Sequence, residues 1–308
     1  MARDSKQSSN WQFQVIQRQL QNPKTGEKIP MWGNFREDTE QCLGVTSEQY
    51  GLVQNTALMS TAIAALEARG LKDYEQRMVV SGDGQRFYAE LTFKNRNLAT
   101  AIGDLLGYKF IIKNSFDRSL RTSLGLGFLR LACLNGMTTT ENEFAITRKH
   151  SAQVTVDFLG DAIDKALAAG KSALSIFDTL ASVAITDEQG QNILAHFEDK
   201  KLLSGTLREH MLTLWLAPRR QEDKARNLYN LYNAMTEYLT HQVGVERYEY
   251  AGKVGDNVLM TLVNAARKPE QLSKIIVPAP KAGTSIVVNV PATFDVVDAA
   301  GNVTPVSV

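Results

Sequence analysis

The hydrophobic periodicity of this chain changes once, near residue 154, and that change restricts the folds open to it. Before this point, short runs alternate apolar and polar residues, as in Met78–Ser81 and Arg86–Phe93, which is the pattern of β-strands. After it, apolar residues recur every three or four positions, as in the stripe from Leu228 to Leu239. Strands followed by helices predict an α+β fold, in which a mostly antiparallel basic sheet with a packed helix precedes a helical half.

The order of these segments also predicts the domain organisation. Residues 1–10 are polar and are expected to form a disordered leader. A single α+β domain is expected over residues 11–272, with its sheet part over 11–151 and its helical part over 152–272. Residues 273–308 are rich in Val, Pro, Gly and Ala and show no helical period, so they are expected to form an extended tail.

Glycines and capping residues predict where turns and helix ends fall. Gly82-Asp83-Gly84 lies between two alternating runs and predicts a hairpin, and Gly125-Leu126-Gly127 predicts a second turn between strands. Thr46 lies three residues before Gln49, the spacing of a capping box, and so predicts a helix start. That helix is expected to end at Gly70, because glycine readily adopts the left-handed conformation that closes a helix.

The composition and the missing motifs exclude several classes of protein. No apolar run approaches the roughly 18–20 residues that span a bilayer, and the polar N-terminus has no signal-peptide core. Cys42 and Cys133 lie far apart without a CxxC motif, and no histidine pair has zinc-ligand spacing. Neither a phosphate-binding GxxxxGK[ST] loop nor a GxSxG motif occurs. The sequence therefore predicts a cytoplasmic protein that is not an enzyme and has no cofactor, metal or membrane partner.

Positive charge is concentrated in the middle of the chain. Residues 77–150 hold eleven Lys and Arg against six Asp and Glu, a balance of +5, although the whole chain carries only +1. A local excess of this kind favours a specific polyanion site over general electrostatic attraction. The expected nucleic-acid-binding residues are Lys94, Arg96, Lys109, Lys113, Asn114, Arg118, Arg121, Arg130, Asn135, Arg148, Lys149 and His150.

Each of these assignments has a structural alternative. The aromatic rings of the same stretch either stack on bases or form the core, in which case the cations are a solvated face; these rings are Phe87, Tyr88, Tyr108, Phe110 and Phe116.

Single residues are open in the same way. His150 contacts phosphate, acts as a general base with Asp117, or is structural. Asn114 and Asn135 either bond a nucleotide backbone or belong to turns, and Cys133 is expected to be a buried, inert thiol.

Several motifs follow one another along the chain in a fixed order. They are Tyr50-Gly51-Leu52-Val53-Gln54-Asn55, Asn114-Ser115-Phe116-Asp117-Arg118-Ser119, Arg130-Leu131-Ala132-Cys133-Leu134-Asn135-Gly136, Arg148-Lys149-His150-Ser151 and the segment from Tyr232 to His241. With these residues the chain resembles, from about Val45 to Ala266, the phage- and plasmid-encoded proteins of unknown function often labelled phage/plasmid-like protein. That family usually has Asn-Ser-x-Asp-Gly-Ser in the second motif, so Arg118 replaces a glycine and adds a positive charge.

A second resemblance lies in the order of elements. A helix, several antiparallel strands and a further helix are similar to the core of phage single-strand annealing proteins of the RecT, Red-beta and Erf kind. Together the two resemblances imply a homo-oligomeric phage or plasmid protein of DNA metabolism, in the host cytoplasm if phage-encoded. It would bind single-stranded DNA and promote annealing or recombination. The alternative is a protein-interaction factor that inhibits a host defence or restriction system through the same charged face.

Overall fold

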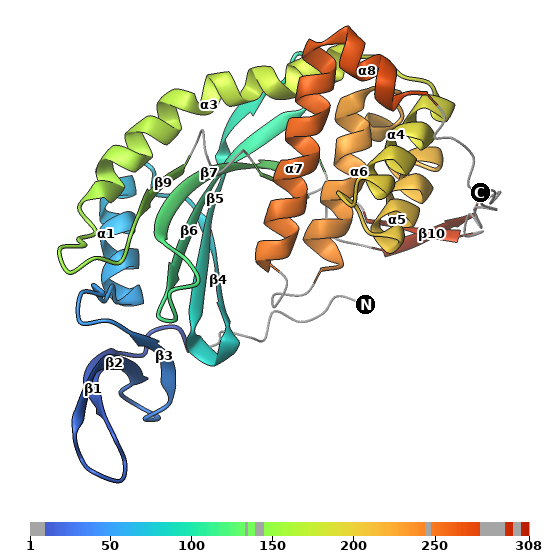
Figure 1. Cartoon of the computed structure of the whole chain (residues 1–308). Helices are drawn as coiled ribbons and strands as arrows, with labels where there is room; N and C mark the ends of the chain where they lie inside the picture. Colours follow the sequence, from blue (N-terminus) through green and yellow to red (C-terminus); the bar gives the residue numbers. More distant parts are fainter. Residues whose placement is uncertain are drawn as a thin grey trace. The chain divides into compact units, whose positions relative to one another are not determined.

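The computed structural model describes residues 10–132, 135–138, 145–243, 248–277, 293–297 and 303–307 (Figure 1). Its antiparallel sheets and α-helices confirm the predicted α+β fold. The chain divides into two compact units: unit 1 holds residues 1–98, 106–129 and 138–171, and unit 2 holds residues 99–105, 130–137 and 172–308. The single domain expected over residues 11–272 stays a prediction.

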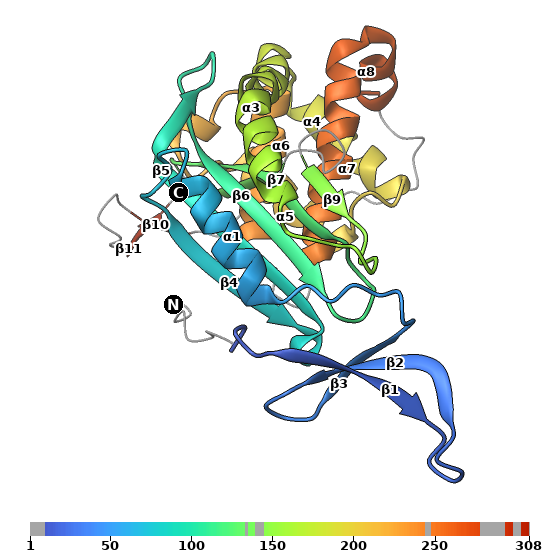
Figure 2. The ribbon, with the colours of Figure 1, turned by 90° about the vertical axis from the view of Figure 1, so that its left-hand side faces the viewer.

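Most of the larger sheet lies in unit 1. Its strand order is β4-β5-β6-β7-β8, and β9 pairs with β7 outside that path. The strands are β4 Glu75–Ser81, β5 Arg86–Ala99, β6 Leu105–Ser115, β7 Thr122–Arg130, β8 Asn135–Thr138 and β9 Ala145–Arg148. Helix α1, Asn55–Glu67, lies across one face of this sheet (Figure 2). It buries Leu58, Ala62 and Leu66, which share one side of the helix.

Local glycine rules explain one predicted turn and fail at the other. The hairpin between β4 and β5 is confirmed, and Gly82, Asp83 and Gly84 form it with positive φ angles of 60°, 55° and 112°. The predicted turn at Gly125-Leu126-Gly127 is wrong, because β7 runs straight through it. Leu126 is 3% exposed, so burial of the residues between the glycines holds the strand extended.

A smaller three-stranded sheet begins unit 1. It pairs β1 Val15–Gln21, β2 Lys28–Arg36 and β3 Cys42–Thr46 in the order β1-β2-β3. Phe13, Val15 and Leu43 form a buried cluster with Phe116, the residue that follows β6. This cluster joins the small sheet to the turn between β6 and β7.

The two predicted ends of α1 have different outcomes. The capping box at Thr46 is wrong: Thr46 is the buried last residue of β3, and its hydroxyl donates to the carbonyl of Trp32 at 3.4 Å. The helix end at Gly70 is confirmed, with φ of 74°. The Leu71 N–H donates to the Leu66 carbonyl and the Gly70 N–H to the Glu67 carbonyl, the Schellman pattern.

Unit 2 is mainly helical. Helix α3, Phe158–Ser182, begins in unit 1 and ends in unit 2, and it is followed by α4 Asp187–Asp199, α5 Gly205–Leu216, the 3-10 turn η2 Gln221–Asp223, α6 Leu228–His241, α7 Tyr248–Arg267 and α8 Pro269–Ile275. Both α5 and α7 contact α6. Leu228, Leu231, Tyr232 and Met235 are fully buried on α6, which confirms the predicted apolar stripe.

The ends of the chain are described only in part. Strands β10 Thr293–Val297 and β11 Val303–Ser307 pair antiparallel within the expected tail. The predicted leader, apart from residue 10, and residues 278–292, 298–302 and 308 of the tail lie outside the described residues. No helix in the described part of the chain has the length and apolar character needed to cross a membrane.

Candidate functional site

Three of the sequence motifs meet around His150 in unit 1. The imidazole of His150 lies parallel to the ring of Tyr50, with centroids 4.7 Å apart. Its Nδ1 is 3.0 Å from the carbonyl oxygen of Gly51, and its Nε2 is 3.2 Å from Oγ1 of Thr122. Because a carbonyl oxygen only accepts, Nδ1 carries a proton and donates it to Gly51. The ring is therefore held at both nitrogens and on one face.

Asn114 continues this hydrogen-bond chain towards helix α1. Its Nδ2 donates to the carbonyl of Val53 at 2.8 Å and to Oδ1 of Asn55 at 2.9 Å. Both partners accept, so the amide orientation is fixed and Oδ1 faces the Thr122 hydroxyl at 3.1 Å. Asn114 and Thr122 are fully buried. Asn114 therefore orders the motifs internally and offers no atom to a nucleotide.

Gly51 makes the close approach of these segments possible. A Cβ atom at this position would lie 1.9 Å from the carbonyl oxygen of Ser151 and 2.4 Å from a methyl group of Val154. The Gly51 N–H donates to the His150 carbonyl at 3.3 Å. Tyr50 is fixed independently, because its hydroxyl donates to the carbonyl of Ser115 at 2.7 Å. The segment after β3 is thus fastened to both β6 and the end of β9.

Four exposed cations lie at this end of the sheet. In the register of the β7–β9 pair Thr122 lies opposite Arg148, so Arg121 and Lys149 follow at the same end of the two strands. Arg118 lies in the turn between β6 and β7. We call Arg118, Arg121, Arg148 and Lys149 the cationic patch; all four side chains are exposed.

The charges of the cationic patch are not neutralised within the part of the chain that the structure describes. None of the four residues forms an ion pair there. Arg148 lies with its guanidinium 5.1 Å from the ring centroid of Phe158 and donates to the Thr147 carbonyl. Arg148 is the last residue of β9 and Lys149 follows it, while Arg121 precedes β7, so the patch lies at one end of two paired strands.

The other lysines predicted to bind nucleic acid are paired with carboxylates or half-buried. Lys94 pairs with Glu75, and Lys109 pairs with Glu90, each at 2.6 Å. Lys109 is only 8% exposed, so its ammonium group is committed to that carboxylate. Lys113 is half-buried on β6. The structure therefore does not bring the predicted cations together into one surface.

Some predicted residues cannot be placed in a site. The side chains of Arg96 and Asn135, and the whole of Cys133, lie outside the described residues.

The rings considered for base stacking belong largely to the core. Phe87, Phe110 and Phe116 are fully buried and Tyr88 is 2% exposed, while Tyr108 is half-buried. These four rings therefore belong to the core and cannot stack on bases.

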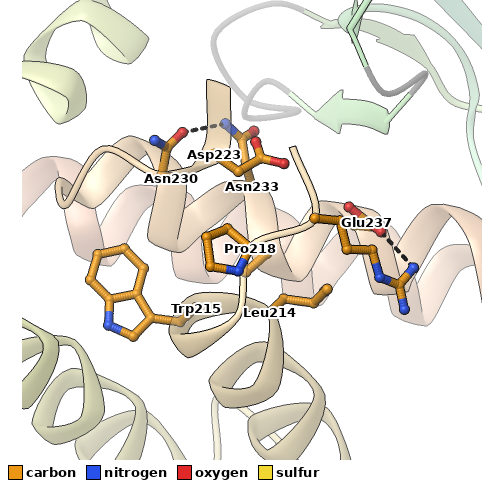
Figure 3. Close-up of a pocket in the computed structure, with 9 residues that line it drawn as sticks. Leu214, Trp215, Pro218, Asp223, Asn230, Asn233 and Glu237 are labelled. Carbon is orange, nitrogen blue, oxygen red and sulfur yellow. Dashed lines mark hydrogen bonds and ion pairs between the residues drawn. The ribbon is translucent and has the colours of Figure 1, made fainter. Parts of the chain in front are cut away.

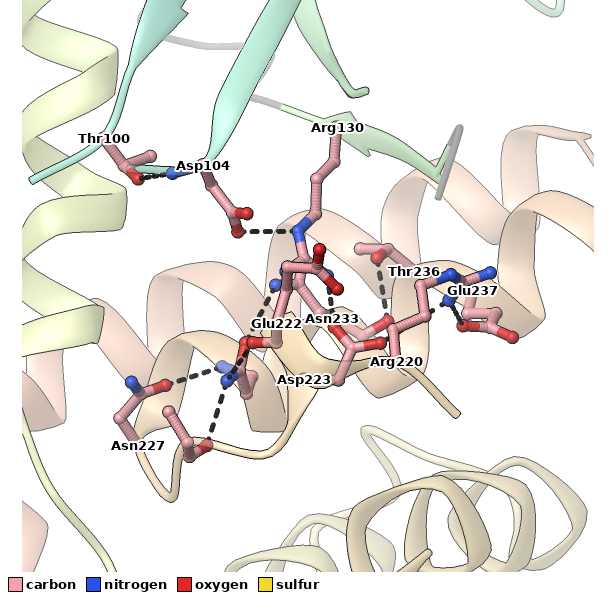
Figure 4. Close-up of polar contacts among 12 residues, drawn as sticks. Thr100, Asp104, Arg130, Arg220, Glu222, Asp223, Asn227, Asn233, Thr236 and Glu237 are labelled. Carbon is pink, nitrogen blue, oxygen red and sulfur yellow. Dashed lines mark hydrogen bonds and ion pairs between the residues drawn. The ribbon is translucent and has the colours of Figure 1, made fainter. Parts of the chain in front are cut away.

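Arg130 is part of a buried ionic cluster in unit 2. Its side chain is fully buried; Nε donates to Asp104 at 2.7 Å and Nη1 bonds Asp223 (Figure 4). The guanidinium also lies 5.7 Å from the ring centroid of Tyr229, and burial raises the pKa of that phenol. With two carboxylates bound in the interior, Arg130 is unsuited to bind phosphate.

Helix α6 contributes a polar side that the sequence reasoning missed. Asn227, Asn230, Asn233, Thr236 and Glu237 are all buried beside its apolar stripe. Three asparagines at a spacing of three residues were the available signal, because amides on one side of a helix favour an internal hydrogen-bond network.

The polar side of α6 borders a small pocket. Trp215 and Pro218 lie on one side of it, and Asn230 and Asn233 lie on the other (Figure 3). Glu237 accepts from Arg219 at 3.2 Å and from Arg220 at 2.7 Å, so its charge is neutralised.

The described residues contain no group of three His, Cys, Asp or Glu side chains placed to hold a metal ion. Cys42 is a free, exposed thiol.

Residues 42–271 match the family described as Domain of unknown function (DUF932), and the chain belongs to this family. The motifs that meet at His150 and the whole cationic patch lie inside the matched range. The expected membership of a family of unknown function is thereby confirmed. Comparisons with curated proteins and with solved structures gave no match.

Proposed function

We propose that this chain binds single-stranded DNA through its phosphates at the cationic patch, without catalysing a reaction. The observation that supports the proposal most is the grouping of Arg118, Arg121, Arg148 and Lys149 at one end of the β7–β9 pair without ion-pair partners among the described residues. Unpaired surface cations attract phosphates and release their counterions, which drives association.

The shape of the patch favours a single strand over a duplex. The cations follow the ends of β7 and β9 and the turn before β7, and a flexible single strand can follow such a bent path where a stiff duplex cannot. The hydrogen bonds that run from the half-buried His150 through Thr122 to the buried Asn114 hold the strand ends that carry these cations. Since the four buried rings are unavailable for stacking, we expect binding that depends on salt and little on base sequence.

The same mode of binding is compatible with strand annealing. Contacts to phosphates alone leave the base edges open to pair with a second strand. The resemblance to phage and plasmid proteins supports a role in DNA recombination. In this role the protein would anneal strands as a homo-oligomer. A mass measurement with and without oligonucleotide tests the assembly.

Fluorescence anisotropy with a labelled oligothymidylate tests the binding. For four neutralised phosphates, affinity should fall roughly fiftyfold between about 50 and about 200 mM salt. The double variant Arg121→Gln/Lys149→Gln should bind more weakly and show about half the salt dependence, because two of the four cations are gone.

The matched control is Lys72→Gln/Lys165→Gln, which removes two exposed lysines of unit 1 outside the patch and changes the net charge equally. It should bind like the wild type. Absence of binding at low salt, or an equal loss in both double variants, would overturn the proposal. A protein retained from nuclease-treated lysate by the wild type but not by the patch variant would favour the protein-interaction factor.

A further inference from the structure

The hydrogen bonds beneath the cationic patch are one proton short when His150 is neutral. Nδ1 of His150 uses its proton on the Gly51 carbonyl. Thr122 then has a single hydroxyl proton for two acceptors, Nε2 of His150 at 3.2 Å and Oδ1 of Asn114 at 3.1 Å. Asn114 cannot turn its amide around, because Nδ2 already donates to two acceptors. Either the buried Oδ1 of Asn114 or the partly buried Nε2 of His150 therefore lacks a protein donor, which costs free energy.

A second proton on His150 removes this conflict. Nε2–H would donate to Oγ1 of Thr122, and the Thr122 hydroxyl would then donate to Oδ1 of Asn114. Each hydrogen-bond acceptor among the side chains of His150, Thr122 and Asn114 would then have a donor. The charge has to be accommodated in a partly buried place, and burial lowers the pKa of His150, while the hydrogen bond to Gly51 raises it in part. In the free protein His150 is therefore neutral at neutral pH.

The charged residues that directly precede His150 in the chain are positive. Arg148 and Lys149 precede it, and Arg121 lies beside them at the end of β7. The charges of Arg118 and Asp117, in the turn after β6, both affect the pKa of Tyr50: Arg118 lowers it and Asp117 raises it.

The ring stacked against His150 does not itself ionise near neutral pH. Tyr50 has its pKa raised by burial and stays uncharged. Burial is what opposes an imidazolium here, and a polyanion bound at Arg148 and Lys149 would bring negative charge next to His150 and favour the charged form.

We propose that His150 takes up one proton from the solvent when a polyanion occupies the cationic patch, so that binding and protonation are coupled. The inference rests on the proposed function and adds regulation to the same site. Because linkage is reciprocal, the affinity for the oligonucleotide must rise as pH falls. For a single coupled proton the gain is at most about tenfold per pH unit.

NMR titration of the His150 imidazole, assigned by its loss in His150→Gln, tests the coupling directly. The midpoint should move to higher pH when an oligothymidylate is added. Thr122→Val should lower the midpoint in the free protein, because it removes the acceptor for Nε2–H. If the midpoint in ligand-free Thr122→Val equals that of the wild type, the proposed hydrogen bond from Nε2 of His150 to Thr122 is wrong.

Binding measured against pH provides the second readout. Between about pH 5.5 and about pH 8 the wild type should gain affinity severalfold on acidification, within the one-proton limit. His150→Gln should show a flat profile, and His210→Gln, which changes an exposed histidine of unit 2, should keep the wild-type slope. Oligonucleotide binding with an unmoved His150 midpoint would overturn the coupling alone, whereas no binding at any pH would overturn the proposed function and the coupling together.

Discussion

Arg118 holds a backbone conformation that costs free energy. Its φ is 70°, in the left-handed region that glycine occupies without strain. For a residue with a Cβ atom this region costs about 1–2 kcal/mol. The motif resemblance leads one to expect glycine here, and the turn keeps the glycine-like conformation although the residue is Arg. The chain thus retains a strained residue where it gains an exposed cation, which fits a functional reason for the charge.

The variant Arg118→Gly separates stability from binding. Relief of the left-handed strain is offset by the greater entropy of glycine in the unfolded chain, so stability should stay level or rise by up to about 1 kcal/mol. Oligonucleotide affinity should fall, because one patch cation is lost. Urea unfolding and anisotropy measure the two effects.

Arg121→Gly is the matched comparison for this variant. Arg121 precedes strand β7 and has no positive φ, so glycine there should lower stability by about 0.5–1 kcal/mol while weakening binding similarly. Equal stability losses in the two variants would contradict the strain argument.

Among the elements, two threonines show how far a local motif can be trusted. Thr46 has capping-box spacing with Gln49, yet its hydroxyl bonds the neighbouring strand and α1 begins only at Asn55. Thr186 has the same spacing with Gln189, and there both capping-box hydrogen bonds form at the start of α4. Strand pairing decides between them, because the backbone of Thr46 is already committed to β2.

The cap of α4 can be tested by Thr186→Ala. The change leaves an N–H at the helix start without its acceptor and should lower stability by about 1 kcal/mol. Thr206→Ala, an exposed position in the first turn of α5 without a capping role, should change stability by less than about 0.5 kcal/mol. Chemical denaturation followed by circular dichroism measures both. A loss in Thr206→Ala as large as that in Thr186→Ala would refute the assigned cap.

Elements set by local rules could be read from the sequence. The hairpin at Gly82–Gly84, the helix end at Gly70 and the stripe of α6 depend on neighbouring residues and were predicted correctly. The candidate site was predicted only in part, because its contacts join residues far apart in the chain. His150 and Gly51 are 99 residues apart, and the commitment of Lys109 to Glu90 follows from strand pairing alone.

Across the whole molecule, the stability of the fold should depend on the protonation of His150. Burial lowers the pKa of His150 in the folded chain below the value of about 6.5 that an unfolded histidine has. Below about pH 6.5 the unfolded chain therefore binds a proton that the folded chain does not yet bind. This contribution to the free energy of unfolding is fully present above about pH 6.5 and is lost as pH falls towards the folded pKa.

Urea unfolding of wild type and His150→Gln at a series of pH values measures this effect. The free energy of unfolding of the wild type minus that of His150→Gln should be constant above about pH 7. It should decrease on acidification, because only the wild type loses the His150 contribution. An oligonucleotide should stabilise both proteins, and only in the wild type should this stabilisation grow as pH falls. A stability difference that grows towards low pH would mean that folding raises the pKa of His150, and the sign of the proposed burial effect would be wrong.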